Sequence, residues 1–139
     1  MVWVAWPKSR CYAAAMGPYL IVFAGAGVGG MARHGVNMLA ARLGFAFPAG
    51  TFAINVAGSF LMGCLTAWFA QRMGVSQHFK LFLTTGLLGG FTTFSAFSLD
   101  AAVMWERGAW GPFAAYALGS LVLSVAALFA GMAAVRLLA

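Results

Sequence analysis

The chain has 139 residues, of which 63% are hydrophobic and only 7% are charged, whereas average soluble proteins carry roughly 25% charged residues. A soluble domain of this size could not hide so much apolar surface from water. Its net charge of +6 comes from residues that stand singly near the ends of apolar segments, which argues against a nucleic-acid partner and for an all-α integral membrane protein.

The apolar segments, taken in chain order, predict four membrane spans. Residues 1–17 are interpreted as an N-terminal extension and not as a secretory signal, because their apolar stretch is short and Pro7 interrupts it. A spanning helix needs about 20 apolar residues. The segments that reach this length are residues 18–43, 49–71, 78–105 and 110–137. Short linkers between them predict antiparallel neighbours within one domain, residues 18–139.

Small residues and charges add two expectations about assembly. Gly25, Gly29, Gly58 and Gly63 stand at spacings that let helix backbones approach closely in lipid. Basic residues favour the cytoplasmic side, but they divide almost evenly here. One membrane face would hold Lys8, Arg10, Arg72, Lys80 and Arg136, and the other Arg42 and Arg107. Without the N-terminal extension the faces differ by one residue, a bias that permits insertion in both orientations.

The apolar spans lack the groups that catalysis or proton coupling would need. They contain no Ser-His-acid set, no paired carboxylates and no His or Cys cluster. Proton-coupled transport usually needs an intramembrane acid, and the only acids, Asp100 and Glu106, lie toward the end of the third span. We therefore expect no enzyme activity and no energy coupling.

Three spans each carry a stripe of uncharged polar side chains, which stand at helical spacing in the second and fourth spans. The stripes are Thr51, Asn55 and Ser59; Thr92, Thr93, Ser95 and Ser98; and Tyr116, Ser120 and Ser124. One stripe alone would be explained by interhelical hydrogen bonds, each worth about 0.6 kcal/mol. Three stripes together with an interrupted helix indicate a polar path through the protein.

The interruption is predicted within "GLLGGFTTFSAFS", residues 86–98. Glycine and β-branched threonine both disfavour helix, so we expect a break over residues 89–93. A break frees backbone carbonyls and amides, which lipid tolerates only where they face protein, a cavity or an ion. Freed carbonyls can coordinate a cation. A simple kink is the alternative.

Two phenylalanines follow the predicted break. Phe94 and Phe97 are three residues apart and so share a helix face. The edge of a phenyl ring is electropositive, and ring edges that face a pore could therefore contact an anion without trapping it. On the spacing alone, ordinary core packing is the preferred explanation.

Three motifs resemble those of the Fluc fluoride channels, a family also called CrcB. "GGFTTFSAFS" is similar to the family's third-helix signature, "GVGGMARHGV" to its first-helix pattern and "GTFAINVAGSFLMG" to its second-helix pattern. The resemblance covers about residues 19–137. It implies a passive fluoride channel of the bacterial inner membrane that gives resistance to fluoride, built as an antiparallel, dual-topology homodimer with two pores.

The resemblance also implies roles for individual residues. Phe94 and Phe97 match the phenylalanines that line the pores, and Arg33 matches an arginine with a structural or vestibule role. Gly89 and Thr92 match positions whose backbone carbonyls bind a structural sodium ion at the dimer centre. The other implied pore positions are Asn55, Thr93, Ser95, Ser98, Tyr116, Ser120 and Ser124. One departure is Asp100, where the family would lead us to expect the longer glutamate.

Two other functions remain open on the sequence. A small four-helix proton-coupled multidrug exporter has a similar size, but it needs an acid deep in the first helix, which has none here. A membrane assembly subunit without a transport role would predict that polar substitutions alter assembly while no ion moves.

Overall fold

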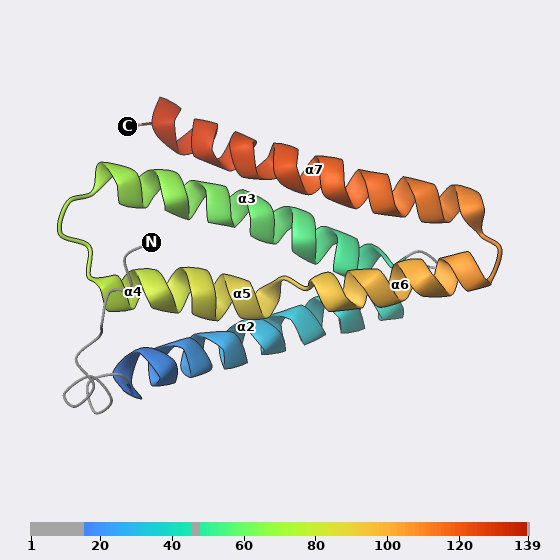
Figure 1. Cartoon of the computed structure of the whole chain (residues 1–139), viewed down its shortest axis with the longest axis horizontal. Coiled ribbons are helices and arrows are strands. Elements are labelled where there is room, and N and C mark those ends of the chain that lie inside the picture. The colour runs from blue at the N-terminus through green and yellow to red at the C-terminus, as the bar shows by residue number, and fades with distance from the viewer. Residues whose placement is uncertain (1–15, 46–47, 139) are drawn as a thin grey trace, which may run out of the picture.

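The computed structural model describes residues 16–45 and 48–138, and these residues form helices joined by short connections (Figure 1). Four rod-like units alternate in direction. They are α2 (Met16–Arg42), α3 (Ala49–Gln71), a segmented third unit and α7 (Trp110–Leu137). The third unit consists of α4 (Gln77–Leu81), the π-helix η1 (Phe82–Leu88), α5 (Gly89–Phe91) and α6 (Phe94–Glu106). Residues 1–15 of the predicted N-terminal extension lie outside the described residues, and Met16 and Gly17 begin α2.

Three of the four predicted spans meet the length and apolarity that a membrane crossing requires. Among the described residues these are Ala49–Gln71, Gln77–Glu106 and Trp110–Leu137. Helix α2 has 27 residues, enough at about 1.5 Å per residue to cross, but Arg33 and His34 interrupt its apolar run. Its crossing of the membrane therefore stays a prediction.

Two glycine-lined seams hold the bundle together. A Cβ at Gly25 would stand 2.7 Å from the Phe82 carbonyl oxygen, so α2 approaches η1 backbone to backbone. At the second seam, Gly63 of α3 and Gly131 of α7 each lie against backbone of the other helix. Close backbone approach through small residues is how helices pack in lipid.

Gly86 and Gly90, before the break, are packing residues, which corrects the interpretation of the glycines as helix-breaking. Gly86, Gly89 and Gly90 all have helical conformations. A Cβ at Gly90 would stand 2.5 Å from the Ala26 carbonyl oxygen, and one at Gly86 would stand 3.0 Å from the Gly25 Cα. At Gly86 and Gly90 the third unit therefore needs glycine to touch α2, not to leave the helical conformation.

The π-helix was not predicted. Within η1 the Thr84 hydroxyl donates to the Lys80 carbonyl oxygen at 2.9 Å, which places a side chain on a carbonyl of the preceding turn. Such back-bonding bends helices, and π-segments are frequent near functional sites. Here the π-segment ends at Leu88, directly before the helix that leads into the break.

Candidate functional site

The helix of the third unit is interrupted at Thr92 and Thr93. Both have extended backbone angles, with φ and ψ of −78° and 157° at Thr92 and −153° and 119° at Thr93. The Thr93 hydroxyl accepts a hydrogen bond from the Ala96 amide at 3.2 Å and so caps the new helix α6. A β-branched residue that can act as an N-cap suits this position. The interruption occupies the last two residues of the predicted range 89–93.

Asn55 satisfies the backbone that the interruption exposes. Its side-chain oxygen accepts from the Thr93 amide at 2.9 Å, and its side-chain nitrogen donates to the Thr93 carbonyl oxygen at 3.0 Å. The amide thus pairs with buried Thr93 as a neighbouring peptide would, across 38 residues of sequence. The side-chain NH2 group of Asn55 has two N–H donors, and the bond to Thr93 uses one of them. The second N–H is available to another acceptor.

A cavity of about 340 Å³ opens beside this junction, between α3, α7 and the start of α6. Most predicted pore residues contribute to its wall. The lining residues are Asn55, Gly58, Ser59, Met62, Thr92, Thr93, Phe94, Phe97, Ser120, Leu121, Ser124, Val125 and Leu128. None of these described residues is charged, and the polar ones offer hydroxyl and amide groups.

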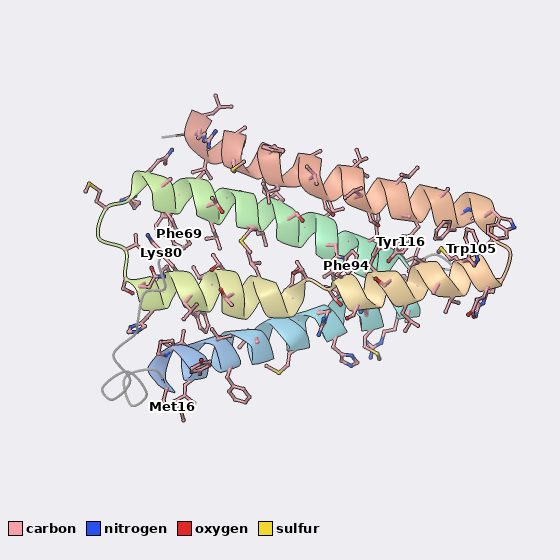
Figure 2. The ribbon with its side chains drawn as sticks, viewed as in Figure 1. Met16, Phe69, Lys80, Phe94, Trp105 and Tyr116 are labelled. Atoms are coloured by element: carbon pink, nitrogen blue, oxygen red, sulfur yellow. The ribbon has the colours of Figure 1, made fainter. Side chains whose placement is uncertain are left out.

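The two phenyl rings form one wall of the cavity. Their centroids are 5.5 Å apart with the planes tilted by 40°, and Phe97 also lies 5.1 Å from the ring of Tyr116. Figure 2 shows Phe94 at the start of α6 and Tyr116 on the facing helix α7. Phe94 is 80% exposed in the single chain. The described chain therefore covers only a small part of this ring.

Ser120 is a buried hydroxyl without a partner inside the described chain. It is 6% exposed, lines the cavity and makes no hydrogen bond there. An unpaired buried polar group costs free energy, and it is satisfied if the cavity holds water or an anion. Ser124, one turn further along α7, lines the same cavity.

Several predicted site residues lie outside the cavity wall. Ser95 is exposed and stands 3.2 Å from the Thr93 hydroxyl. Ser98 donates to the Phe94 carbonyl oxygen at 2.9 Å. Gly89 and the half-buried Arg33 do not line the cavity either. Fully buried Tyr116 stands behind the Phe97 ring and does not line it.

The sequence analysis missed what Tyr116 bonds to. Its hydroxyl donates to a carboxylate oxygen of Asp100 at 3.2 Å. Asp100 follows Phe97 by three residues, which puts it on the same face of α6. The three-residue spacing was the available signal in the sequence. In the structure, Asp100, Tyr116 and Phe97 form one cluster.

The interruption leaves backbone carbonyls around the end of α5 without their helical donors, and those of Gly89 and Thr92 are two of them. In a continuous helix the Gly89 carbonyl would accept from the Thr93 amide and the Thr92 carbonyl from the Ala96 amide. Those amides are bonded to the Asn55 side chain and the Thr93 hydroxyl instead. These two carbonyls are the chemical type that a hard cation prefers. No cluster of His, Cys, Asp or Glu that could bind a metal occurs within the described chain.

The sequence has clear relatives. The family described as "CrcB-like protein, Camphor Resistance (CrcB)" matches residues 20–132. A "Fluoride-specific ion channel FluC" of Methylobacterium nodulans is 59% identical over 117 residues, which cover 84% of this chain and 94% of that protein. A protein of the same name in Rhodopseudomonas palustris strain BisB5 is 58% identical. A "Fluoride-specific ion channel FluC 2" of Nitrobacter hamburgensis is 56% identical. Each of these two alignments covers 85% of this chain and 96% of the relative.

Proposed function

This chain belongs to the CrcB family, and on that premise we propose that it is a passive, fluoride-selective channel of the bacterial inner membrane. It is a multi-pass membrane protein whose task is ion conduction and not catalysis. Passive flow would let fluoride leave the cell down its gradient and so protect the cell from fluoride.

The observation that carries the proposal is the uncharged wall of the cavity. Fluoride is small and strongly hydrated, so a pore must replace its water with hydrogen-bond donors. The Ser120 and Ser124 hydroxyls, the spare Asn55 N–H and the edges of Phe94 and Phe97 supply such groups around one space. Conduction requires binding that is favourable enough to admit an ion and weak enough to release it. Neutral donors meet that need better than a fixed cation would.

The remaining hydroxyls take supporting roles in this scheme. Thr93 lines the cavity and caps α6, and Ser95 bonds to Thr93. Ser98 holds the carbonyl of Phe94, and Tyr116 supports the Phe97 ring. Arg33 on α2 is outside the cavity and serves structure or a vestibule.

The volume and exposed rim of the cavity support a homodimer, for which we propose the antiparallel arrangement. Its volume of about 340 Å³ greatly exceeds the roughly 30 Å³ of liquid that one water molecule occupies, so one chain does not form a narrow path for a bare ion. Phe94 and Leu121 on its rim are 80% and 63% exposed. A second copy packed on this rim would narrow the space, and two inverted copies would create two equivalent pores.

A structural sodium ion at the centre of that dimer is the function we propose for the freed carbonyls. The Gly89 and Thr92 oxygens lack their helical donors, as described above. A cation shared between two copies would satisfy them and would fix the junction from which Phe94 and Phe97 project. Sodium accepts carbonyl oxygen ligands of this kind at broken helices.

The two alternatives explain less of the site. A proton-coupled exporter would place a titratable acid in the transport cavity, whereas none of the described lining residues is acidic. An assembly subunit without transport would have no need for an unpaired hydroxyl such as Ser120 beside the half-buried donors Asn55 and Ser124 and a ring pair.

A flux experiment tests the proposal. The purified protein is reconstituted into liposomes loaded with potassium fluoride, a potassium ionophore is added, and external fluoride is followed with an electrode. We expect fluoride efflux from these liposomes and none of chloride from matched liposomes loaded with potassium chloride. Folded dimer that releases no fluoride, or releases both halides alike, would overturn the proposal.

A further inference from the structure

A second groove lies away from the ion site, at the end of the bundle where α3 and α7 both end (Figure 1). Its volume is about 690 Å³. The groove is lined by Trp68, Gln71, Arg72, Val135 and Leu138. α3 and α7 touch backbone to backbone at Gly63 and Gly131, and the groove lies toward the ends of both helices. Both helices are candidate membrane spans, and the end of a helix that crosses the hydrocarbon core lies near the lipid headgroups.

The guanidinium group of Arg72 is held at this groove. It lies 5.9 Å from the centroid of the Trp68 ring, which is the geometry of a cation–π contact. Backbone angles of −110° and 106° at Arg72 turn the chain away from the helix axis at this point. An arginine fixed on a tryptophan at a helix end loses less side-chain freedom when it binds a ligand than a free arginine does.

The surrounding charge at this end is positive. Lys80 lies 5.6 Å from the centroid of the Phe69 ring, on the side of α3 that faces α4 (Figure 2), and Arg136 is exposed in the last turn of α7. Both acids of the sequence, Asp100 and Glu106, belong to α6 in the other half of the bundle. The two helix C-termini carry about −0.5 charge each, which the full charges of Arg72, Lys80 and Arg136 exceed.

We propose that this groove binds the headgroup phosphate of an anionic phospholipid. A guanidinium group matches phosphate oxygens with two parallel hydrogen bonds, and the Gln71 amide can donate a third. Basic pockets between membrane helices are sites for anionic headgroups. The groove also has apolar walls at Val135 and Leu138, and Leu137 and Leu138 beside it are 86% and 89% exposed. These residues give the acyl chains a surface, which a free phosphate ion would not need.

The proposal does not depend on fluoride transport, and a lipid-binding experiment tests it. The full-length protein in detergent is titrated with dioctanoyl phosphatidylglycerol, with dioctanoyl phosphatidylcholine and with inorganic phosphate, and bound lipid is counted by native mass spectrometry. Arg72→Gln is compared with the native chain, and Arg42→Gln is the matched control because Arg42 is an exposed arginine at the opposite end of the bundle. Arg72→Lys keeps the charge and removes the planar fork.

We expect the native chain to retain phosphatidylglycerol and to bind phosphatidylcholine and phosphate far more weakly. Arg72→Gln should weaken phosphatidylglycerol binding about fivefold, the usual contribution of one basic residue near an anionic headgroup, and Arg72→Lys by less. Arg42→Gln should leave binding unchanged. The proposal is wrong if Arg72→Gln and Arg42→Gln bind phosphatidylglycerol alike, or if inorganic phosphate binds as tightly as the lipid.

Discussion

Replacing Asn55 with alanine should destabilise the junction between α5 and α6. The substitution removes both hydrogen bonds to Thr93 and leaves the buried amide and carbonyl of Thr93 without partners. A buried polar group left unsatisfied costs about 1–3 kcal/mol, so two such groups cost about 2–6 kcal/mol. Interhelical hydrogen bonds in membranes average about 0.6 kcal/mol, so two bonds of average strength would contribute about 1.2 kcal/mol, which we take as the low end of the expected range.

The measurement is the free energy of unfolding of the purified protein, obtained by titrating sodium dodecyl sulfate into detergent micelles. Ser59→Ala is the control, because Ser59 lies one turn further along α3 and lines the same cavity without bonding to Thr93. We expect Asn55→Ala to lose at least about 1.2 kcal/mol and Ser59→Ala to stay within about 0.5 kcal/mol of the native chain. If Asn55→Ala lost fluoride flux while its stability matched that of Ser59→Ala, Asn55 would be a pore donor alone and the reasoning about the junction would fail.

Two further substitutions test the packing around the site by the same titration. Tyr116→Phe keeps the ring but removes the hydrogen bond to the Asp100 carboxylate, and should lower the free energy of unfolding by about 1.5–3 kcal/mol; an unchanged value would show that Asp100 does not depend on the hydroxyl. Gly90→Ala places a Cβ 2.5 Å from the Ala26 carbonyl oxygen and should cost about 1–3 kcal/mol through overpacking. Gly27→Ala is the control, because its Cβ meets no atom within 4 Å, and it should be neutral or stabilising by up to about 1 kcal/mol. Equal changes in the free energy of unfolding for Gly90→Ala and Gly27→Ala would contradict the close packing of the third unit on α2.

The lengths of two helices could be predicted from the sequence because local sequence signals mark where they begin. The residue ranges predicted for α3 and α7 agree with the structure, since Pro48 precedes the first and a turn with Gly108 at φ of +68° precedes the second. The polar stripes of α3 and α7 were also visible, because a helical repeat puts their members on one face.

The causes of the broken helix could not be read from local sequence. The low helix propensities of glycine and threonine predicted a break, but the prediction that the glycines cause it was wrong. Gly90 stays helical and packs on Ala26, while Thr92 and Thr93 leave the helix. The bond from Asn55 to Thr93 joins residues 38 positions apart, and no local pattern predicts such a pairing. The same holds for Tyr116 and Asp100, which come from different helices.

Fluoride efflux from liposomes that contain ring variants tests most directly whether the phenyl edges carry the ion. Phe94→Ile and Phe97→Ile remove the aromatic edges from the cavity wall, and Phe79→Ile on α4 is the control outside it. We expect both cavity variants to elute as dimers in size-exclusion chromatography and to lose most of their fluoride efflux, while Phe79→Ile conducts like the native chain. Native efflux from folded Phe94→Ile and Phe97→Ile dimers would contradict this expectation.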